Sequence, residues 1–504
     1  MGVAMVLAEM RWCYGCWEQE RIALLQLKPF FDSSLTLQNW ADAEEGSDCC
    51  QWERVECSST TGRVTQLSLN NTRDLISGKW YLNASLFLAF EELTSLYLMG
   101  NLILGFENEG FERLSARLSN LEVLDLSYNF FNESILPSLN GFSSLKSLNL
   151  GYNQFTLPIQ AQDLPNFENL EDLFLDKISL NNSFLQRVRV MTSLKVLSLS
   201  GCGLTGLLPN AQGLCELINL QMLDVSNNDL RVPCPGVCVP SSFGNMSSLE
   251  ILDLSDNQLS GIIPELLAIG CFSLDTLILS NNNLQGHIFS EHFNLTKLWW
   301  LQLDGNNFSG RISNCLSTSS LSILDLRDNH LSGRIPGWIG NLSYLKDLVI
   351  SNNHLEGPIP LEFCQLHYLE VLDLSKNNVS GPIPSTFSNL EQIESLDLSY
   401  NNLEGKIPFQ LTKLNYLSVF SVAHNNLSGM TPERTEQFAT FDASSYEGNP
   451  YLCGLPLPKN CTSSTESLSW PRASAMDEDS GFLDMNVFYA SFTVSYIFVL
   501  LGIS

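Results

Sequence analysis

Recurring aspartates and a pair of histidines are the side chains of this sequence best suited to chemistry. An aspartate between two apolar residues, in the phrase Leu-Asp-Leu-Ser or a close variant, occurs at Asp125, Asp224, Asp253, Asp325, Asp373 and Asp397. Two neighbouring carboxylates could serve as a general acid and base. Because these aspartates repeat with the phrase that contains them, we interpret them as a solvated strip of the fold. His330 and His354 take equivalent places in neighbouring phrases, and we expect a stacked pair on a solvated turn rather than a metal site or pH sensor.

Signatures of catalysis are missing from the sequence. It contains no phosphate-binding loop, no kinase signature, no Gly-x-Ser-x-Gly and no His-Glu-x-x-His. We therefore expect no enzyme, and no catalytic, cofactor-binding or metal-binding residues. The formal net charge of −28, from 54 acidic and 26 basic residues, argues against a nucleic-acid partner, which would need Lys and Arg on phosphates. It argues equally against adhesion to an anionic membrane surface.

Cysteines gather near both ends of the sequence. Adjacent Cys49 and Cys50 cannot easily bridge each other, so the economical pairing is Cys50 with Cys57 and Cys49 with Cys16. A zinc site is the alternative, although ligands are usually spaced by two residues and no histidine lies nearby. A further bridge is expected between Cys453 and Cys461. Such bridges indicate an oxidising compartment. Cys234 and Cys238 could form a small loop bridge or remain two free thiols, and the sequence fits both equally. The pairing of the other cysteines also stays open: Cys202, Cys215, Cys271, Cys315 and Cys364.

Acceptors for N-linked glycans are frequent. Some matches to Asn-x-Ser/Thr must arise by chance in a sequence rich in Asn and Ser, yet their number favours a glycoprotein. The acceptors are Asn70, Asn83, Asn132, Asn181, Asn245, Asn294, Asn307, Asn341, Asn378, Asn426 and Asn460.

The elements that must position these residues come from a sequence repeat. The phrase Leu-x-x-Leu-Asp-Leu-Ser-x-Asn-x-Leu-x-Gly-x-Ile-Pro recurs with spacings of 23 to 29 residues, within the range of leucine-rich repeats. Leu369, Leu372 and Leu374 are expected to point inward from a short strand, with Val371 and Asp373 on its other face. The fold class is therefore α/β: a right-handed leucine-rich-repeat solenoid with parallel strands on its concave face and disulfide-capped ends.

A buried asparagine is expected to close each strand, because its amide can satisfy several backbone groups of a turn. Fifteen positions follow from the alignment of the repeats, of which Thr72 and Ile178 are weak. They are Thr72, Asn101, Asn129, Asn153, Ile178, Cys202, Asn228, Asn257, Asn282, Asn306, Asn329, Asn353, Asn377, Asn401 and Asn425.

The segments outside the repeats complete the predicted organisation. Residues 18–28 read as a short amphipathic helix that ends before Pro29. Residues 487–504 carry no charge and are just short of a full membrane span. The predicted boundaries are a weak or truncated signal peptide at 1–15, an N-terminal cysteine-bridged cap at 16–63, the repeat array at 64–437, a C-terminal cap at 438–461, an acidic flexible juxtamembrane linker at 462–485 and a truncated transmembrane helix at 486–504.

Together these features resemble the plant leucine-rich-repeat receptor-like proteins, which are cell-surface receptors that lack a kinase. The resemblance rests on ERIALLQLK followed by CCQWERVEC, the repeats themselves, FSVAHNNLSG, and the cap YEGNPYLCGLPLPKNC before an acidic linker and an apolar helix. It implies a single-pass plasma-membrane protein with an extracellular N-terminal region that senses a peptide, protein or glycan in defence or development. It also implies signalling through a membrane receptor kinase co-receptor. Members usually carry a non-repeat island before the last repeats, and none interrupts Asn377 to Asn401.

Repeats that depart from the consensus are the predicted ligand-binding part of the concave face. One set is Trp299, Trp300, Gln302 and Asp304, where an outward-facing Trp would be costly unless a partner, a glycan at Asn294 or the curvature covers it. The other is Asp172, Phe174 and Asp176. The family resemblance places the partner kinase on the last repeats, at Glu394, Ser395, Asp397, Ser418 and Ser421. The competing interpretation is a secreted binding or enzyme-inhibitor protein of the same fold, or a truncated fragment that does not signal.

Overall fold

A 16-stranded sheet runs through the array, with nearly every strand parallel to its neighbours. The computed structural model describes residues 16–32, 36–41, 48–107, 110–160, 162–165, 167–207, 217–231, 246–289, 293 and 295–461. The predicted signal peptide, linker and membrane helix lie outside these residues, as do Cys215, Cys234, Cys238, Asn245 and Asn294. No helix within the described ranges is long and apolar enough to cross a membrane.

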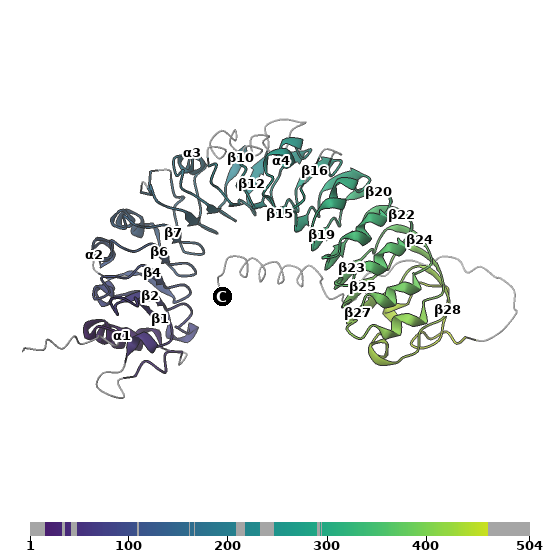
Figure 1. Ribbon diagram of the computed structural model, residues 1–504, viewed down its shortest axis with the longest axis horizontal. Coiled ribbons are helices and arrows are strands. Elements are labelled where there is room, and N and C mark those ends of the chain that lie inside the picture. Colours follow the sequence, from purple (N-terminus) through teal and green to yellow (C-terminus); the bar gives the residue numbers. More distant parts are fainter. Residues whose placement is uncertain are drawn as a thin grey trace, which may run out of the picture. The chain divides into compact units, whose positions relative to one another are not determined.

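The strands of this sheet line the inner side of the array (Figure 1). In order they are β1 (Val55–Cys57), β2 (Val64–Ser68), β4 (Ser95–Tyr97), β6 (Val123–Asp125), β7 (Ser147–Asn149), β8 (Asp172–Phe174), β9 (Val196–Ser198), β11 (Met222–Asp224), β13 (Ile251–Asp253), β15 (Thr276–Ile278), β17 (Trp300–Gln302), β19 (Ile323–Asp325), β21 (Asp347–Val349), β23 (Val371–Asp373), β25 (Ser395–Asp397) and β27 (Val419–Ser421). Only β1, in the N-terminal cap, pairs antiparallel. The strands β2 to β27 precede the fifteen predicted turn positions, and the sheet continues without a break past Asn306.

A second, nine-stranded sheet forms from the segment after each turn. Its strands are β14 (Ser260–Gly261), β16 (Asn283–Gly286), β18 (Asn307–Gly310), β20 (His330–Arg334), β22 (His354–Pro358), β24 (Asn378–Gly381), β26 (Asn402–Gly405), β28 (Asn426–Met430) and β29 (Tyr451–Cys453). Two-stranded sheets join β3 (Trp80–Leu82) to β5 (Ile103–Phe106), and β10 (Thr205–Leu207) to β12 (Asp229–Arg231).

Short helices connect the second sheet to the next inner strand. The α-helices are α1 (Glu18–Phe31), α2 (Gly110–Arg117), α3 (Phe184–Val188) and α4 (Glu265–Gly270). The 3₁₀-helices are η1 (Cys49–Gln51), η2 (Leu75–Ser77), η3 (Ala84–Phe87), η4 (Glu133–Gly141), η7 (Asn314–Thr318), η8 (Gly337–Asn341), η9 (Leu361–Gln365), η10 (Ser385–Asn389), η11 (Phe409–Lys413), η12 (Glu436–Ala439) and η13 (Ala443–Ser445). Prolines 336, 360, 384 and 408 are the N-caps of η8 to η11. Each of these helices therefore begins directly after the Gly-x-Ile-Pro tail of its repeat or the equivalent segment.

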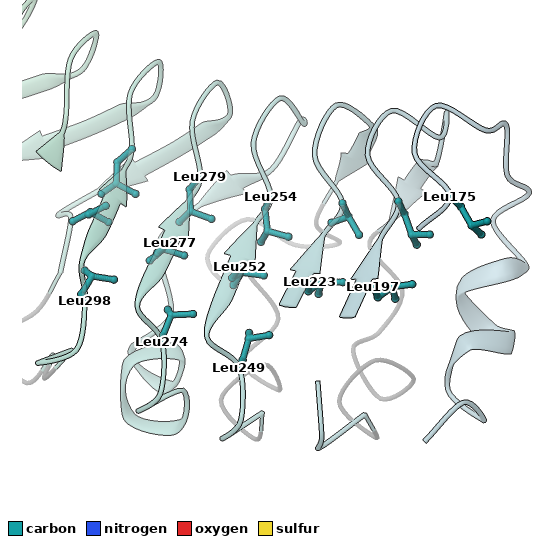
Figure 2. Close-up of a cluster of buried hydrophobic side chains, with 14 of the residues drawn as sticks. Leu175, Leu197, Leu223, Leu249, Leu252, Leu254, Leu274, Leu277, Leu279 and Leu298 are labelled. Carbon is teal, nitrogen blue, oxygen red and sulfur yellow. The ribbon is translucent and has the colours of Figure 1, made fainter. Parts of the chain in front are cut away.

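The core is a stack of leucines. Leu249, Leu252 and Leu254 of one repeat lie beside Leu274, Leu277 and Leu279 of the next (Figure 2), and all six are fully buried. Each repeat has an apolar face that only its neighbours can cover, so the core is continuous along the array.

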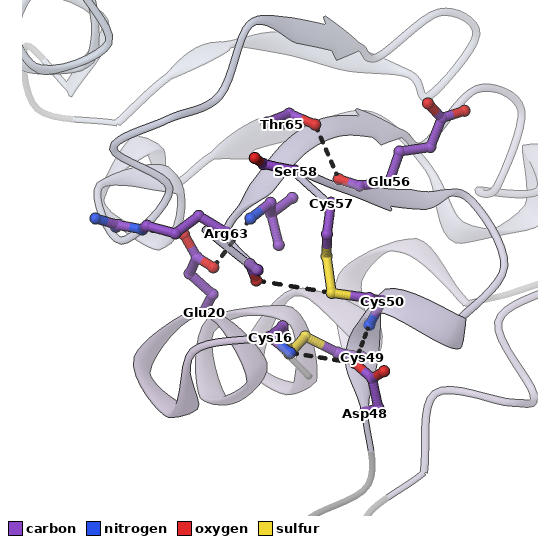
Figure 3. Close-up of a disulfide and its surroundings, with 12 residues drawn as sticks. Cys16, Glu20, Asp48, Cys49, Cys50, Glu56, Cys57, Ser58, Arg63 and Thr65 are labelled. Atoms are coloured by element: carbon purple, nitrogen blue, oxygen red, sulfur yellow. Dashed lines mark hydrogen bonds and ion pairs between the residues drawn. A yellow bond between two sulfur atoms is a disulfide. The ribbon is translucent and has the colours of Figure 1, made fainter. Parts of the chain in front are cut away.

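The N-terminal cap is closed by two disulfides, Cys16–Cys49 and Cys50–Cys57, which confirms both predicted pairs (Figure 3). The helix α1 extends through Pro29 to Phe31, two to three residues beyond the predicted end. Pro29 lies in the final turn of α1, so the single backbone hydrogen bond that its missing N–H forfeits falls close to the helix end.

A buried ion pair joins the N-terminal cap to the first strand of the array. Arg63 Nε donates to Glu20 Oε1 at 3.0 Å, and the backbone N–H of Val64 donates to Glu20 Oε2 at 3.1 Å. Burial raises the pKa of Glu20, although these hydrogen bonds oppose the shift.

The C-terminal cap contains the predicted Cys453–Cys461 disulfide and one turn residue that the sequence analysis missed. Asn449 Nδ2 donates to the carbonyls of Val422 and Tyr446 at 2.9 Å, and its Oδ1 accepts from Leu427 N at 3.0 Å. It follows Asn425 by the regular interval of 24 residues, so the spacing alone could have identified it. The asparagine ladder therefore continues into the cap.

Candidate ligand-binding surface

The inner sheet presents alternate side chains to the concave face, as the repeat predicts. Leu369, Leu372 and Leu374 are fully buried, and Asp373 lies half-buried on the opposite side of β23. Val371 also faces outward but is 7% exposed. The concave face therefore consists of side chains that lie close against those of the neighbouring strands, which are about 4.8 Å away.

The asparagine ladder holds these strands in register. Asn377 Nδ2 donates to the carbonyls of Ile350, Leu374 and Ser375 at 3.0 to 3.2 Å, and Leu355 N donates to its Oδ1. The predicted buried role is confirmed. At two ladder positions without an asparagine, Thr72 Oγ1 and Cys202 Sγ each donate to a backbone carbonyl. Ile178 is buried and has no side-chain donor to offer.

The repeated aspartates are not a solvated strip, and that prediction is wrong. Asp125, Asp253 and Asp325 are buried, and the other three are half-buried. All six carboxylates accept the backbone N–H two residues onward, at 2.8 to 3.1 Å. The aspartates therefore close the turn after each strand, which draws the carboxylate toward the backbone and away from water.

Burial changes the acidity of these carboxyl groups. It raises the pKa of Asp224 to about 8 and that of Asp253 to about 6, and the two residues are register partners on β11 and β13. Burial likewise raises the pKa of Asp397 to about 6, with a further contribution from its register partner Asp373. Pairs of neighbouring carboxylates thus recur along the array wherever two repeats both carry the aspartate. This recurrence supports a structural role for the pairs over a catalytic dyad.

The first predicted ligand set lies on and after β17. Trp299 and Gln302 are half-buried, whereas Trp300 is 1% exposed and Asp304 5%. The ring of Trp300 is therefore covered within the protein, which agrees with the alternative that the curvature shields it. Its Nε1 donates to Gln302 Oε1 at 3.2 Å, and its register partners are Thr276 and Ile323.

Asp304 belongs to the turn after β17 rather than to the strand. Its carboxylate accepts from the Ser280 hydroxyl, and Arg327 Nε lies 3.9 Å from Asp304 Oδ2 and 3.4 Å from Asp325 Oδ2. Trp299 instead reaches toward Tyr344, with 6.1 Å between ring centroids. Of this set, Trp299 and Gln302 remain accessible to a ligand.

The second predicted set lies on β8 and is more open. Asp172, Phe174 and Asp176 are all half-buried, and burial raises the pKa of both carboxyls. Asp176 Oδ1 accepts from the Ser198 hydroxyl at 2.6 Å and from Ser200 N at 2.9 Å. Phe174 lies in register between Asn149 and Ser198, so its ring stands among short polar side chains.

The residues predicted to meet a partner kinase lie on and beside β25 and β27. Glu394 and Ser418 are exposed, Asp397 and Ser421 are half-buried, and Ser395 is buried. Val419, which the sequence analysis did not single out, is 41% exposed in the middle of this group. The predicted alternation of inward and outward side chains could have identified Val419 as an exposed apolar residue on the last inner strand.

The other histidines and cysteines that could take part in chemistry lie in stacked or buried positions of the fold or are single thiols. His330 and His354 stack with 5.8 Å between ring centroids, as expected. Cys202 and Cys271 are buried thiols, and Cys315 and Cys364 are partly exposed thiols. Across the ranges that the structure covers, no group of three or more His, Cys, Asp or Glu side chains could hold a metal ion.

Comparison with sequence families matches the repeats directly. Families described as leucine rich repeat match residues 120–142, 193–214, 248–268, 319–379 and 368–427. A family described as leucine rich repeat N-terminal domain matches residues 18–58.

Similar curated proteins are plant receptor-like proteins. Receptor like protein 21 of Arabidopsis thaliana is 39% identical over 210 residues, which are 39% of this chain and 21% of that protein. Receptor-like protein EIX1 of Solanum lycopersicum is 33% identical over 276 residues, with coverage of 53% and 26%. Cuscuta receptor 1 of Solanum lycopersicum is 30% identical over 428 residues, with coverage of 62% and 38%. The chain thus spans between about a fifth and two fifths of these relatives.

Solved structures agree on the fold. The plant peptide hormone receptor RGFR1 in complex with RGF2 is 25% identical, with a TM-score of 0.60 over 80% of this chain and 65% of that one. A TDR receptor, 24% identical, has the same TM-score over 74% and 70%. This chain is therefore a leucine-rich-repeat protein, and its sequence relatives support its identification as a plant receptor-like protein.

Proposed function

We propose that this chain is the ligand-binding part of a cell-surface receptor-like protein. It binds an extracellular peptide, protein or glycan on its concave face and signals through a membrane receptor kinase co-receptor, in plant defence or development. Its place is the plasma membrane, as a single-pass protein with an extracellular N-terminal region. The receptor-like relatives and the peptide hormone complex of one structural neighbour support this proposal.

One observation carries the proposal: the concave face combines continuous, rigid strands with a few half-exposed departures from the repeat. Phe174 and Trp299 offer aromatic surface, and Gln302 offers a half-buried amide on β17. Aromatic side chains are enriched where partners bind, and a rigid strand lowers the entropic cost of binding. Structural aspartates occupy the outward position of six other inner strands, so recognition is proposed at these departures.

The partner kinase is proposed to meet the end of the inner sheet, at Glu394, Asp397, Ser418 and Ser421. Exposed Val419 gives this surface an apolar centre, which protein interfaces commonly require. The position leaves β8 and β17 free for ligand, so ligand and kinase can bind at the same time.

The test uses the full chain expressed at the surface of plant cells. Cells are exposed to fractions of plant extracellular peptides and of microbial extracts, and association with receptor kinases is measured by co-purification. Phe174→Ala combined with Gln302→Ala should abolish the response to an active fraction without lowering surface abundance. Asp397→Arg should weaken kinase association alone. If both variants respond as the wild type does, the proposal that ligand and kinase bind on the concave face is wrong.

A further inference from the structure

The second sheet carries a line of basic side chains that the proposed receptor function does not use. After the glycine of each repeat comes a residue whose side chain lies over the glycine of the next repeat. Arg311 Cγ and Nε lie 3.1 and 3.2 Å from where a Cβ on Gly333 would be, and Arg334 Cγ lies 3.1 Å from that point on Gly357. Both glycines have φ of +80°, so the backbone excludes other residues there and leaves room for the arginine stems.

The same arrangement places His287 over Gly310. His287, Arg311 and Arg334 therefore follow one another in three consecutive repeats, each stem laid across the next strand. We call these three residues the basic strip. All three are exposed. The strip ends at Ile262 on one side and Pro358 on the other, which occupy the equivalent positions of the adjoining repeats.

The basic strip is not neutralised by the protein itself. Neither Arg311 nor Arg334 takes part in an ion pair within the described ranges. Glu356 is the register partner of Arg334, yet it forms no ion pair with it there.

Lysines of the inner sheet behave differently. Lys146 lies 2.9 Å from Glu122, Lys195 lies 2.5 Å from Glu171 and Lys346 lies 2.8 Å from Glu370. The chain has 54 acidic residues against 26 basic ones. Arginines without an ion-pair partner therefore create a local region of positive electrostatic potential, which favours an anionic partner.

The surroundings of the strip indicate which kind of anion fits. The adjacent exposed positions hold Gln285, Ser309, His330, His354 and the acidic Glu356, so the surface is polar and offers hydrogen-bond donors. It lacks the buried aromatic or aliphatic centre of a protein interface. The cations Arg311 and Arg334 lie one repeat apart, and neighbouring strands are about 4.8 Å apart, which suits a linear polymer with a negative charge on successive units.

We propose that the basic strip binds a linear acidic polysaccharide of uronic acid units. Its carboxylates pair with Arg311 and Arg334, and its hydroxyls bond to the neighbouring polar side chains. This surface lies on a different sheet from the concave ligand site, so the inference does not depend on the proposed receptor function.

The test measures binding of the full chain to immobilised polygalacturonate in calcium-free buffer, because calcium would bridge an acidic protein to an acidic polymer. Arg311→Gln combined with Arg334→Gln should weaken binding about tenfold or more and flatten its dependence on salt. The control is Lys406→Glu, which changes net charge by the same two units. Lys406 lies over Gly429 in the same column, three repeats beyond Arg334, and its variant should bind within about twofold of wild type.

Further arms separate the chemistry of the polymer from charge alone. Fully methyl-esterified polygalacturonate should not bind, and polyglutamate should bind much more weakly than polygalacturonate. Because the glycan acceptor Asn307 lies on β18 near Arg311, binding is measured before and after enzymatic removal of N-glycans. Equal binding by the double arginine variant and wild type, with both folded, would overturn the proposal. Preference for polyglutamate would also overturn it, in favour of an acidic protein partner.

Discussion

Single side chains decide how each repeat turns, and the sequence predicted some of them better than others. The asparagine ladder was predictable because only an amide offers the two donors and the acceptor that the turn requires. The role of the aspartates was not, because a strand pattern shows which way a side chain leaves the backbone and not whether it folds back onto it. Asp125 and Asp253 do fold back, each onto the N–H two residues later.

Asn377→Ala tests the ladder. The substitution removes three donated bonds and one accepted bond inside the core, so it should lower the free energy of unfolding by roughly 2–4 kcal/mol. Asn378→Ala, at the adjacent exposed position, is the matched control and should have little effect. Thermal melting of the two purified variants compares them, and equal melting temperatures would show that the ladder does not stabilise the array.

The raised pKa values of the buried aspartates predict how stability depends on pH. In the folded chain Asp224 and Asp253, with pKa values of about 8 and about 6, keep protons that the unfolded carboxyls lose near pH 4. The folded state therefore binds more protons between about pH 4 and pH 8, and stability must fall as the pH rises through that window.

Asp224→Asn isolates this effect from the general repulsion of a chain with net charge −28. The amide keeps an oxygen for the Ser226 N–H but cannot ionise, so the variant should melt higher than wild type at pH 8 and about equally at pH 4.5. Melting curves across this range provide the measurement. A wild-type chain that is more stable at pH 8 than at pH 5 would contradict the assigned shifts.

At the scale of the element, the alternation of side chains along each strand correctly predicted which residues face inward and which face outward. It did not predict how exposed each residue is. Leu372 is buried and Asp373 faces outward, as predicted. Trp300 also faces outward, yet it is 1% exposed. Exposure depends on neighbours that are 23 or more residues away in the sequence, and the pattern within one strand carries no information about them.

Exchange of polarity at β23 tests the register. Leu372→Asp places an unpaired carboxylate between two repeats and should cost more than about 4 kcal/mol, enough to prevent secretion. Asp373→Leu removes one hydrogen bond to Ser375 N and should cost about 1 kcal/mol. Secreted yield and melting temperature distinguish the two, and comparable values for both variants would mean that the assigned faces are reversed.

For the whole molecule, the repeat predicted the architecture because each unit must be covered by its neighbours. Fifteen turn positions, three disulfides and the parallel inner sheet all followed from spacing. The sequence analysis missed the ladder residue of the C-terminal cap because its segment lacks the leucine pattern, although its interval of 24 residues fits the repeat. The basic strip did not follow from spacing, because it depends on side chains that come together only when repeats stack.

Glycan removal tests the expected compartment. The exposed acceptors among the described residues are Asn83, Asn132, Asn181, Asn307, Asn341, Asn378, Asn426 and Asn460. Protein made in a secretory host should lose apparent mass in several steps when a glycosidase acts on it for increasing times, as its glycans are removed. Protein made in a bacterial host is the control. A secreted band that the enzyme leaves unmoved would contradict the predicted glycoprotein.

The most direct test of concave recognition is a glycan placed on the concave face itself. Val196→Asn creates the acceptor Asn-Leu-Ser on β9, beside Asp172 in register, and Val419→Asn creates Asn-Phe-Ser on β27. A mass shift confirms the added glycan, and melting confirms the fold. The first variant should lose the response to an active ligand fraction, and the second should lose association with the receptor kinase. Full response and association in both glycosylated variants would contradict the assignment of this face as the binding surface.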